Sequence, residues 1–154
     1  MQRLDGAVIF SKFDMQDGYH QVPMAKADKV KMAFTCRYGT FQFTVMPFGL
    51  SSVPATFQRM INNIFFEILD EGVVFYLDDL LLYSRSVEEH IVLLDRVFGL
   101  LAKHHLYLKE SKCSLFLDWV NFLGHMVSAE GVSMESGKVE AVRAWPVPKT
   151  VTHV

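Results

Sequence analysis

VVFYLDDLLLYS, at residues 73 to 84, decides the fold, because it sets two adjacent aspartates between two apolar runs. The runs Val73 to Tyr76 and Leu80 to Tyr83 consist mainly of β-forming residues and predict two short strands. A tight turn between such strands usually contains glycine or asparagine. Asp78 and Asp79 would repel each other there unless a positive charge lay beside them, and a divalent cation supplies such a charge.

A third aspartate closes another apolar run. Ala7 to Phe13 predicts a strand, and Asp14 follows it directly. If the two aspartate-bearing strands are neighbours in a sheet, three carboxylates converge at one sheet edge. Mg²⁺ prefers oxygen ligands, and a pair of such ions stabilises the attacking and leaving oxygens of phosphoryl transfer. Aspartates in turns are also ordinary turn chemistry, so at this point the metal site and the plain turn both stay open.

The other segments predict an α+β fold in which two helices cover one face of an antiparallel sheet. The first helix begins at Ser51 or Ser52 and runs to Gly72, and the second opens with a capping box at Ser86. The remaining predictions are a strand at 19–24, a loop at 25–31, a hairpin at 31–45, strands at 106–108 and 113–116, a hairpin at 119–132 with its turn at 129–131, and a helix at 138–145 ended by Pro146 and Pro148.

Composition limits the classes of protein that fit. The chain has 154 residues, 51% of them hydrophobic, which suits one domain or a compact piece of a larger one. Its net charge of −2 does not by itself indicate a nucleic-acid binder. Cys36 and Cys113 are far apart and predict reduced thiols of an intracellular protein. The six histidines form no zinc-ligand pattern, and neither a signal peptide nor a membrane span is visible, so no membrane partner is expected.

Several motifs in order resemble one family. Tyr76-Leu77-Asp78-Asp79 resembles the Tyr-x-Asp-Asp signature of reverse transcriptases, and FSKFDMQDGYHQ at 10–21 resembles their first catalytic motif. The other matching stretches are GTFQF at 39–43, VMPFGL at 45–50 and PATFQ at 54–58 for the nucleotide and template side, NFLGH at 121–125 for the primer-grip hairpin, and AWPVP at 144–148 for the linker towards an RNase H region. Order and spacing agree from about residue 7 onward and are most similar to the gypsy class of long-terminal-repeat retroelements.

The resemblance implies a polymerase palm with part of the fingers. Residues 1–128 would form the palm, with a fingers-like insertion at about 24–50, and residues 129–154 would start the thumb or linker. Both ends of the chain look cut, which implies a fragment of a polyprotein that also carries protease, RNase H and integrase. Such a polyprotein would act inside the cell, in the cytoplasm within a virus-like particle or in the nucleus.

The resemblance also assigns a metal centre. Asp14, Asp78 and Asp79 would be the catalytic carboxylates and would hold two Mg²⁺ ions, with Mn²⁺ as an alternative. The backbone of Met15 would be a further metal ligand. Lys112 matches a lysine that protonates the leaving pyrophosphate as a general acid.

Further residues would contact substrate. On the nucleotide side, Tyr19 would pack under the sugar and exclude a 2′-hydroxyl, and the other residues implied are Asp17, Gly18, Phe48 and Gly49. On the template and primer side they are Gln58, Tyr76, Leu77, Phe122, Leu123 and Gly124. Taken singly, Tyr19, Phe48, Gln58 and Lys112 each have an ordinary structural interpretation.

The implied function is the template-directed addition of dNTPs to a primer 3′-hydroxyl on RNA or DNA. One alternative is another palm-type polymerase that makes RNA, which would need room where Tyr19 stands. The other is an inactive, truncated retroelement relic that folds but does not polymerise. The sequence departs from the family at Val53, where alanine is frequent, at Lys109-Glu110, where Asn-Pro is usual, and at Asp17, which replaces a frequent serine.

Overall fold

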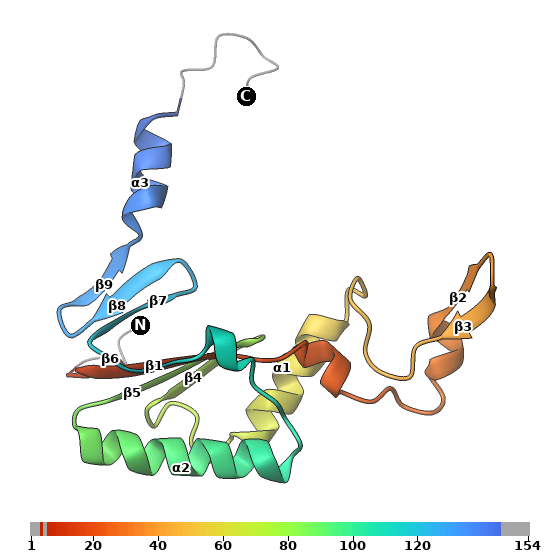
Figure 1. Cartoon of the computed structure of the whole chain (residues 1–154), viewed down its shortest axis with the longest axis horizontal. Coiled ribbons are helices and arrows are strands. Elements are labelled where there is room, and N and C mark those ends of the chain that lie inside the picture. Colours follow the sequence, from red (N-terminus) through yellow and green to blue (C-terminus); the bar gives the residue numbers. More distant parts are fainter. Residues whose placement is uncertain (1–3, 5, 146–154) are drawn as a thin grey trace.

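A four-stranded antiparallel sheet carries the aspartates, in the order β4-β5-β1-β6. The computed structural model describes residue 4 and residues 6–145 (Figure 1). The strands of this sheet are β1 (Ile9–Asp14), β4 (Val73–Tyr76), β5 (Asp79–Ser84) and β6 (Ser114–Leu117). The strands predicted at the start of the chain and on both sides of the aspartate pair are therefore present.

Two helices cover one face of this sheet, α1 (Val53–Ile64) and α2 (Val87–Lys103). Figure 1 shows α2 running beneath the sheet, with α1 beside it. The α+β class and the covering helices were predicted correctly. The core between the layers includes the fully or almost fully buried side chains Phe13, Phe57, Ile61, Phe65, Leu80, Leu82 and Val97. Burying one such side chain contributes about 1.5–3 kcal/mol, so this interface supplies much of the driving force for folding.

A second, three-stranded sheet packs on the opposite face. Its strands are β7 (Trp119–Phe122), β8 (His125–Ser128) and β9 (Gly131–Met134), and helix α3 (Ser136–Arg143) follows them. Figure 1 shows this sheet on the side of β1 and β6 away from α2. A smaller core between the two sheets contains Ala7, Phe10, Leu81, Tyr83, Val120, Phe122 and Val127. Because residues alternate between the faces of a strand, β1 and β5 serve both cores.

A two-stranded hairpin projects away from these layers. It consists of β2 (Ala33–Cys36) and β3 (Gly39–Gln42), and every residue in both strands is exposed. Figure 1 shows it at the end of the molecule remote from the three-stranded sheet. This is the hairpin predicted at 31–45. Three short 3₁₀ helices complete the described elements, at Gly18–Gln21, Lys29–Met32 and Glu110–Lys112. None of the described helices is long and apolar enough to span a bilayer.

Several predicted boundaries were wrong. The strand expected at 19–24 is instead the 3₁₀ helix Gly18–Gln21, because Asp17 adopts a left-handed φ of 49° and turns the chain. Helix α1 ends at Ile64 instead of continuing to Gly72. Phe65 and Ile68 are buried in the non-helical turns that follow α1. Because the apolar repeat continues through these turns, the sequence pattern predicted a longer helix.

The end of the chain also differs from its prediction. The hairpin expected at 119–132 is a three-stranded meander, because Leu123 and Gly124 form a second turn with φ values of 51° and 74°. The turn predicted at 129–131 is present between β8 and β9. The last helix spans Ser136–Arg143, not 138–145. Its predicted terminators, Pro146 and Pro148, lie outside the described residues.

Helix α2 begins where its capping box predicts. The Ser86 side chain accepts a hydrogen bond of 3.2 Å from the Glu89 amide, and the Glu89 carboxylate accepts one from the Arg85 amide. Ser52 is the N-cap residue of α1, but its side chain makes no capping hydrogen bond. Pro54 in the first turn of α1 is compatible with helix, because the amide it lacks would have no partner there.

A buried histidine joins α2 to both central strands. His90 is fully buried, with Nδ1 2.8 Å from Ser84 Oγ and Nε2 2.7 Å from Ser11 Oγ. Ser84 Oγ donates to the carbonyl of Ser86, so it accepts from Nδ1–H. Ser11 Oγ accepts from the amide of Phe116, and its own hydrogen is available to Nε2. A neutral imidazole with its proton on Nδ1 satisfies all these hydrogen bonds, since Nδ1–H donates to Ser84 Oγ and the Ser11 hydroxyl donates to Nε2.

Stability should therefore depend on pH through His90. Burial lowers the pKa of His90 from its ordinary 6.5, so between the two pKa values the unfolded chain binds the proton more readily. We expect this contribution to the free energy of unfolding to be complete above about pH 6.5 and to be lost as the pH falls through the folded-state pKa. Urea unfolding from about pH 5 to about pH 8 measures it. His90→Gln should flatten this slope, whereas the exposed His104→Gln should keep it; equal slopes in the two variants would contradict the assignment.

Candidate functional site

The three aspartates meet at one edge of the central sheet. In the antiparallel pairing of β1 with β5, Asp14 lies directly opposite Asp79, and Asp78 occupies the adjoining turn. Residues directly opposite in an antiparallel pair lie on the same face, with Cβ atoms about 4.5–5.5 Å apart. The expectation that the two aspartate-bearing strands are neighbours is confirmed.

The turn that carries Asp78 is held from two directions. Leu77 adopts a left-handed φ of 52°, and the amide of Met15 donates to the Asp78 carbonyl over 2.9 Å. On the other side the Gln58 amide group spans the turn. Its Oε1 accepts from the Leu77 amide at 2.8 Å, and its Nε2 donates to the Phe75 carbonyl at 3.1 Å. The described contacts thus tie Gln58 to the aspartate turn.

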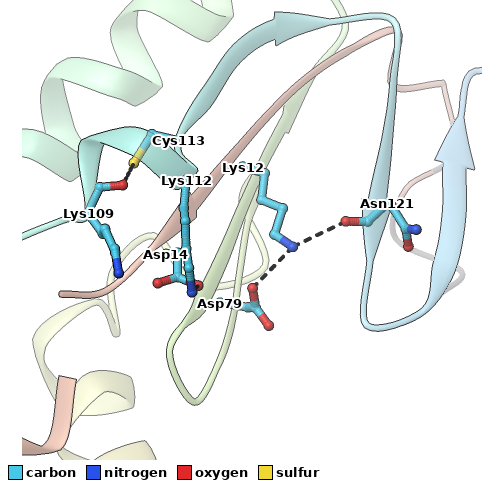
Figure 2. A network of polar contacts seen from close by, with 7 residues as sticks. All are labelled: Lys12, Asp14, Asp79, Lys109, Lys112, Cys113 and Asn121. Atoms are coloured by element: carbon cyan, nitrogen blue, oxygen red, sulfur yellow. Dashed lines mark hydrogen bonds and ion pairs between the residues drawn. The ribbon is translucent and has the colours of Figure 1, made fainter. Parts of the chain in front are cut away.

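Two lysines balance two of the carboxylates, as Figure 2 shows. Lys112 Nζ lies 3.0 Å from Asp14 Oδ2, and Lys12 Nζ lies 3.3 Å from Asp79 Oδ1. The hydrogen bond that Lys112 donates to Asp14 raises the pKa of Lys112, and the charges of Asp14, Asp79 and Asp78 raise it further, so Lys112 stays an ammonium at neutral pH. Sequence reasoning missed Lys12. Its signal was its position two residues before Asp14, on the same face of the strand.

Asp78 differs from the other two aspartates. Its Oδ1 is buried and has no hydrogen-bond partner within the described part of the chain. Burial raises the pKa of Asp78, the charges of Asp14 and Asp79 raise it further, and Lys112 offsets this only in part. A buried carboxylate oxygen without a partner is costly unless a cation or a donor reaches it.

These residues fit a hard divalent cation in part. The donors gathered at the edge are all carboxylate oxygens, which Mg²⁺ prefers, and the buried Asp78 Oδ1 lacks a protein partner. Among the described residues, however, no three His, Cys, Asp or Glu side chains are already arranged to hold an ion. Asp14 and Asp79 are paired with lysines instead. At each of those two carboxylates a lysine would compete with the cation for one oxygen.

Gly18 is packed tightly against Asp78. A Cβ at this position would lie 2.2 Å from Asp78 Oδ1 and 3.1 Å from Phe57 Cζ, so a side chain would displace the carboxylate. Its neighbour Asp17 is exposed at the turn. Sequence analysis placed Asp17 and Gly18 on the triphosphate side, and the structure brings Gly18 against the aspartate turn.

Tyr19 is held between two aromatic rings. It is 9% exposed, and its ring centroid lies 5.2 Å from those of both Phe48 and Phe57. Burial raises the pKa of Tyr19, and the charges of Asp78 and Tyr76 raise it further, so the phenol stays neutral. Phe48 itself is 58% exposed, and a Cβ added at Gly49, where φ is 92°, would meet nothing within 4 Å. Tyr19 and Phe48, predicted to line one pocket, are therefore in contact.

The predicted primer-side residues divide into two groups. Tyr76 is exposed, and Leu77 is half-buried beside the aspartates, at the β4–β5 turn. Leu123 and Gly124 form the turn between β7 and β8, and Leu123 is 43% exposed. Phe122 is buried in the core between the two sheets, so its side chain supports the hairpin instead of pointing outward.

Comparison with known proteins places this chain in a family. Residues 1–127 match the family described as reverse transcriptase (RNA-dependent DNA polymerase). The Tf2-3 transposon polyprotein of Schizosaccharomyces pombe is 35% identical over 149 residues, covering 97% of this chain and 11% of the polyprotein. The retrovirus-related Pol polyprotein from transposon 297 of Drosophila melanogaster is 38% identical over 139 residues, covering 90% of this chain and 13% of that polyprotein.

Solved structures agree with this placement. The foamy viral protease-reverse transcriptase in complex with an RNA/DNA hybrid has a TM-score of 0.82 and 25% identity, covering 95% of this chain and 20% of that one. The same kind of enzyme in complex with double-stranded DNA has a TM-score of 0.86 at 25% identity, covering 95% of this chain and 25% of that one.

The chain therefore belongs to the reverse transcriptase family, and its resemblance to the reverse transcriptases of gypsy-class retroelement polyproteins is confirmed. It spans about a tenth of the length of these polyproteins. The division near residue 128, the individual site residues and the metal ions stay predictions.

Gly18→Ala should destabilise the fold. The new Cβ would meet Asp78 Oδ1 and the ring of Phe57, and overpacking of this kind costs about 1–3 kcal/mol of unfolding free energy. Urea unfolding measures the change. Gly99→Ala is the matched control, because Gly99 is an interior residue of α2 and a Cβ added there would meet nothing within 4 Å. The control should be stabilised by about 0.5–1 kcal/mol, and equal effects would contradict the tight packing.

Gln58→Ala should loosen the aspartate turn. It removes the partners of the Leu77 amide and the Phe75 carbonyl, which should cost about 1–3 kcal/mol of unfolding free energy. Asn62→Ala is the control, because it removes only the exposed 2.8 Å contact with Gln58 and should cost less than about 0.5 kcal/mol. Hydrogen exchange at Leu77 locates the effect. An amide at Leu77 that exchanges no faster in Gln58→Ala would refute this role.

Proposed function

We propose that this chain is the palm core of an RNA-directed DNA polymerase, which adds dNTPs to a primer 3′-hydroxyl as directed by an RNA or DNA template. The observation that carries the proposal is the sheet edge at which Asp14, Asp78 and Asp79 meet, with Asp78 Oδ1 buried and unpartnered among the described residues. Membership in the reverse transcriptase family supports the same reaction.

The carboxylates would hold two Mg²⁺ ions, or Mn²⁺ in their place, and Met15 would add a backbone ligand. When bound, such ions make the primer hydroxyl more nucleophilic and neutralise charge on the triphosphate. Little covalent work then remains for the protein, because positioning and charge stabilisation dominate phosphoryl transfer. Lys112, which stays protonated beside Asp14, would give a proton to the leaving pyrophosphate.

Tyr19 would select the sugar of the incoming nucleotide. Its ring is fixed between Phe48 and Phe57, so it cannot easily move aside for a 2′-hydroxyl. A rigid ring at this position favours dNTPs and disfavours the alternative of an RNA-making palm polymerase. Asp17, Gly18 and Gly49 would complete the nucleotide side. Leu77, Leu123 and Gly124 would contact the template or primer.

The relatives support the proposed partners. Two of the similar solved structures contain an RNA/DNA hybrid or double-stranded DNA, and the curated relatives are polyproteins. We infer that this chain acts on a primed template as part of a polyprotein with protease, RNase H and integrase, inside the cell, in a cytoplasmic particle or the nucleus. With a net charge of −2, this chain alone offers little electrostatic attraction for a duplex.

Asp78→Asn in a polymerase that contains this palm tests the metal centre. Losing a metal ligand should lower primer extension by about 10²- to 10³-fold, because a catalytic ion supplies several kcal/mol of transition-state stabilisation. Mn²⁺ binding to the 154-residue chain, followed by electron paramagnetic resonance, should weaken in parallel. Asp118→Asn, at an exposed residue between β6 and β7, is the control and should leave both unchanged.

Normal primer extension by Asp78→Asn would show that the metal assignment is wrong. If the wild-type polymerase binds Mn²⁺ but extends no primer, the inactive relic is the better description.

A further inference from the structure

Lys12 lies between the aspartate edge and the β7–β8 hairpin. It points to the same face of β1 as Asp14, and its Nζ is 3.3 Å from Asp79 Oδ1 and 3.3 Å from the carbonyl oxygen of Asn121 (Figure 2). The Lys12 and Asp79 side chains are 29% and 32% exposed, so the pair is partly shielded from water. One ammonium thus contacts β5 and β7 from its place on β1.

The contact with Asn121 reaches the hairpin assigned to the primer. Asn121 directly precedes Phe122, which is buried between the sheets, and then Leu123 and Gly124 at the turn. Movement of β7 relative to β5 would therefore break either the ion pair or the hydrogen bond of Lys12. Because Nζ carries three hydrogens, it can serve both partners at once.

We propose that Lys12 is a positioning residue with two effects: it ties Asp79 to the β7–β8 hairpin, and its charge weakens the hold of Asp79 on a divalent cation. This rests on the proposed polymerase function, in which Asp79 binds a metal and the hairpin faces the primer. The tether sets the separation between the carboxylate and the primer-side turn. The charge would lower the affinity of Asp79 for a divalent cation.

Removal of the Lys12 charge and disturbance of the fold should change the cation affinity in opposite directions. An ammonium 3.3 Å from Asp79 Oδ1 repels a dication at that oxygen, so its removal should tighten cation binding. A variant that merely disturbed the fold would weaken binding instead. Lys12→Met preserves most of the side-chain length and its apolar stem, and it removes the charge. Lys12→Arg keeps the charge and the donors.

Mn²⁺ affinity of the 154-residue chain, measured by electron paramagnetic resonance, tests the charge effect. Lys12→Met should bind Mn²⁺ about three- to tenfold more tightly than wild type, and Lys12→Arg should bind it within about twofold of wild type. Hydrogen exchange tests the tether. Amides of residues 119–128 should exchange faster in Lys12→Met, and Lys12→Arg should restore their protection.

Lys138→Met is the matched control. Lys138 Nζ also donates to a carbonyl of this hairpin, that of Gly124 at 3.5 Å, but it makes no described ion pair with an aspartate. Its loss should affect hairpin exchange and leave Mn²⁺ affinity unchanged.

Two results would overturn the proposal for Lys12. They are unchanged or weaker Mn²⁺ binding in Lys12→Met while wild type binds the ion, and unaltered exchange at 119–128 in the same variant. Absence of Mn²⁺ binding by wild type would be a different failure. It would overturn the proposed metal centre and, with it, the proposed effect of the Lys12 charge on cation binding. The hydrogen-exchange data would then test only whether Lys12 ties Asp79 to the β7–β8 hairpin.

Discussion

The register between β1 and β5 is the constraint on which the site depends. The pairing runs without interruption from Ile9 opposite Ser84 to Asp14 opposite Asp79. A slip of β1 by one residue would turn Phe13 out of the helix-side core and Phe10 out of the core between the two sheets. Both faces of the sheet are buried against other layers, so two apolar cores resist that slip at once. The position of the aspartates is thus fixed mainly by hydrophobic packing several residues away from them.

Packing alone does not explain why three carboxylates tolerate one another. Asp14 and Asp79 are paired with lysines from different elements, Lys112 at the end of the short helix Glu110–Lys112 and Lys12 on β1. Asp78 has no such partner among the described residues, and the raised pKa that follows from burial and its acidic neighbours reflects this imbalance. The site is therefore incompletely compensated at one oxygen, which is the property expected of a centre that accepts a cation.

Local patterns predicted the parts of this arrangement that depend on local sequence. The short strands, the capped start of α2 and the aspartate turn were readable because alternation and turn chemistry act over a few residues. The contact of Lys12 with Asn121 and that of Gln58 with Leu77 were not readable, since they join residues 109 and 19 positions apart. The strand wrongly predicted at 19–24 failed for a similar reason. Tyrosine has a high β propensity, but the position of Tyr19 depends on its ring contacts with Phe48 and Phe57.

The layers on the two faces of the sheet make different kinds of contact with the aspartate edge. From the helical layer, α1 presents Phe57 to the ring of Tyr19 and, one residue later, Gln58 to the turn before Asp78. From the other layer, β7 presents the Asn121 carbonyl to Lys12 and so to Asp79. Tyr19, which we propose for the nucleotide side, and the β7–β8 hairpin, which we propose for the primer side, therefore belong to separate packing units. Both contact the sheet edge that carries the aspartates, so we expect a change in the helical layer to act first on the turn of Asp78 and a change in the other layer to act first on Asp79.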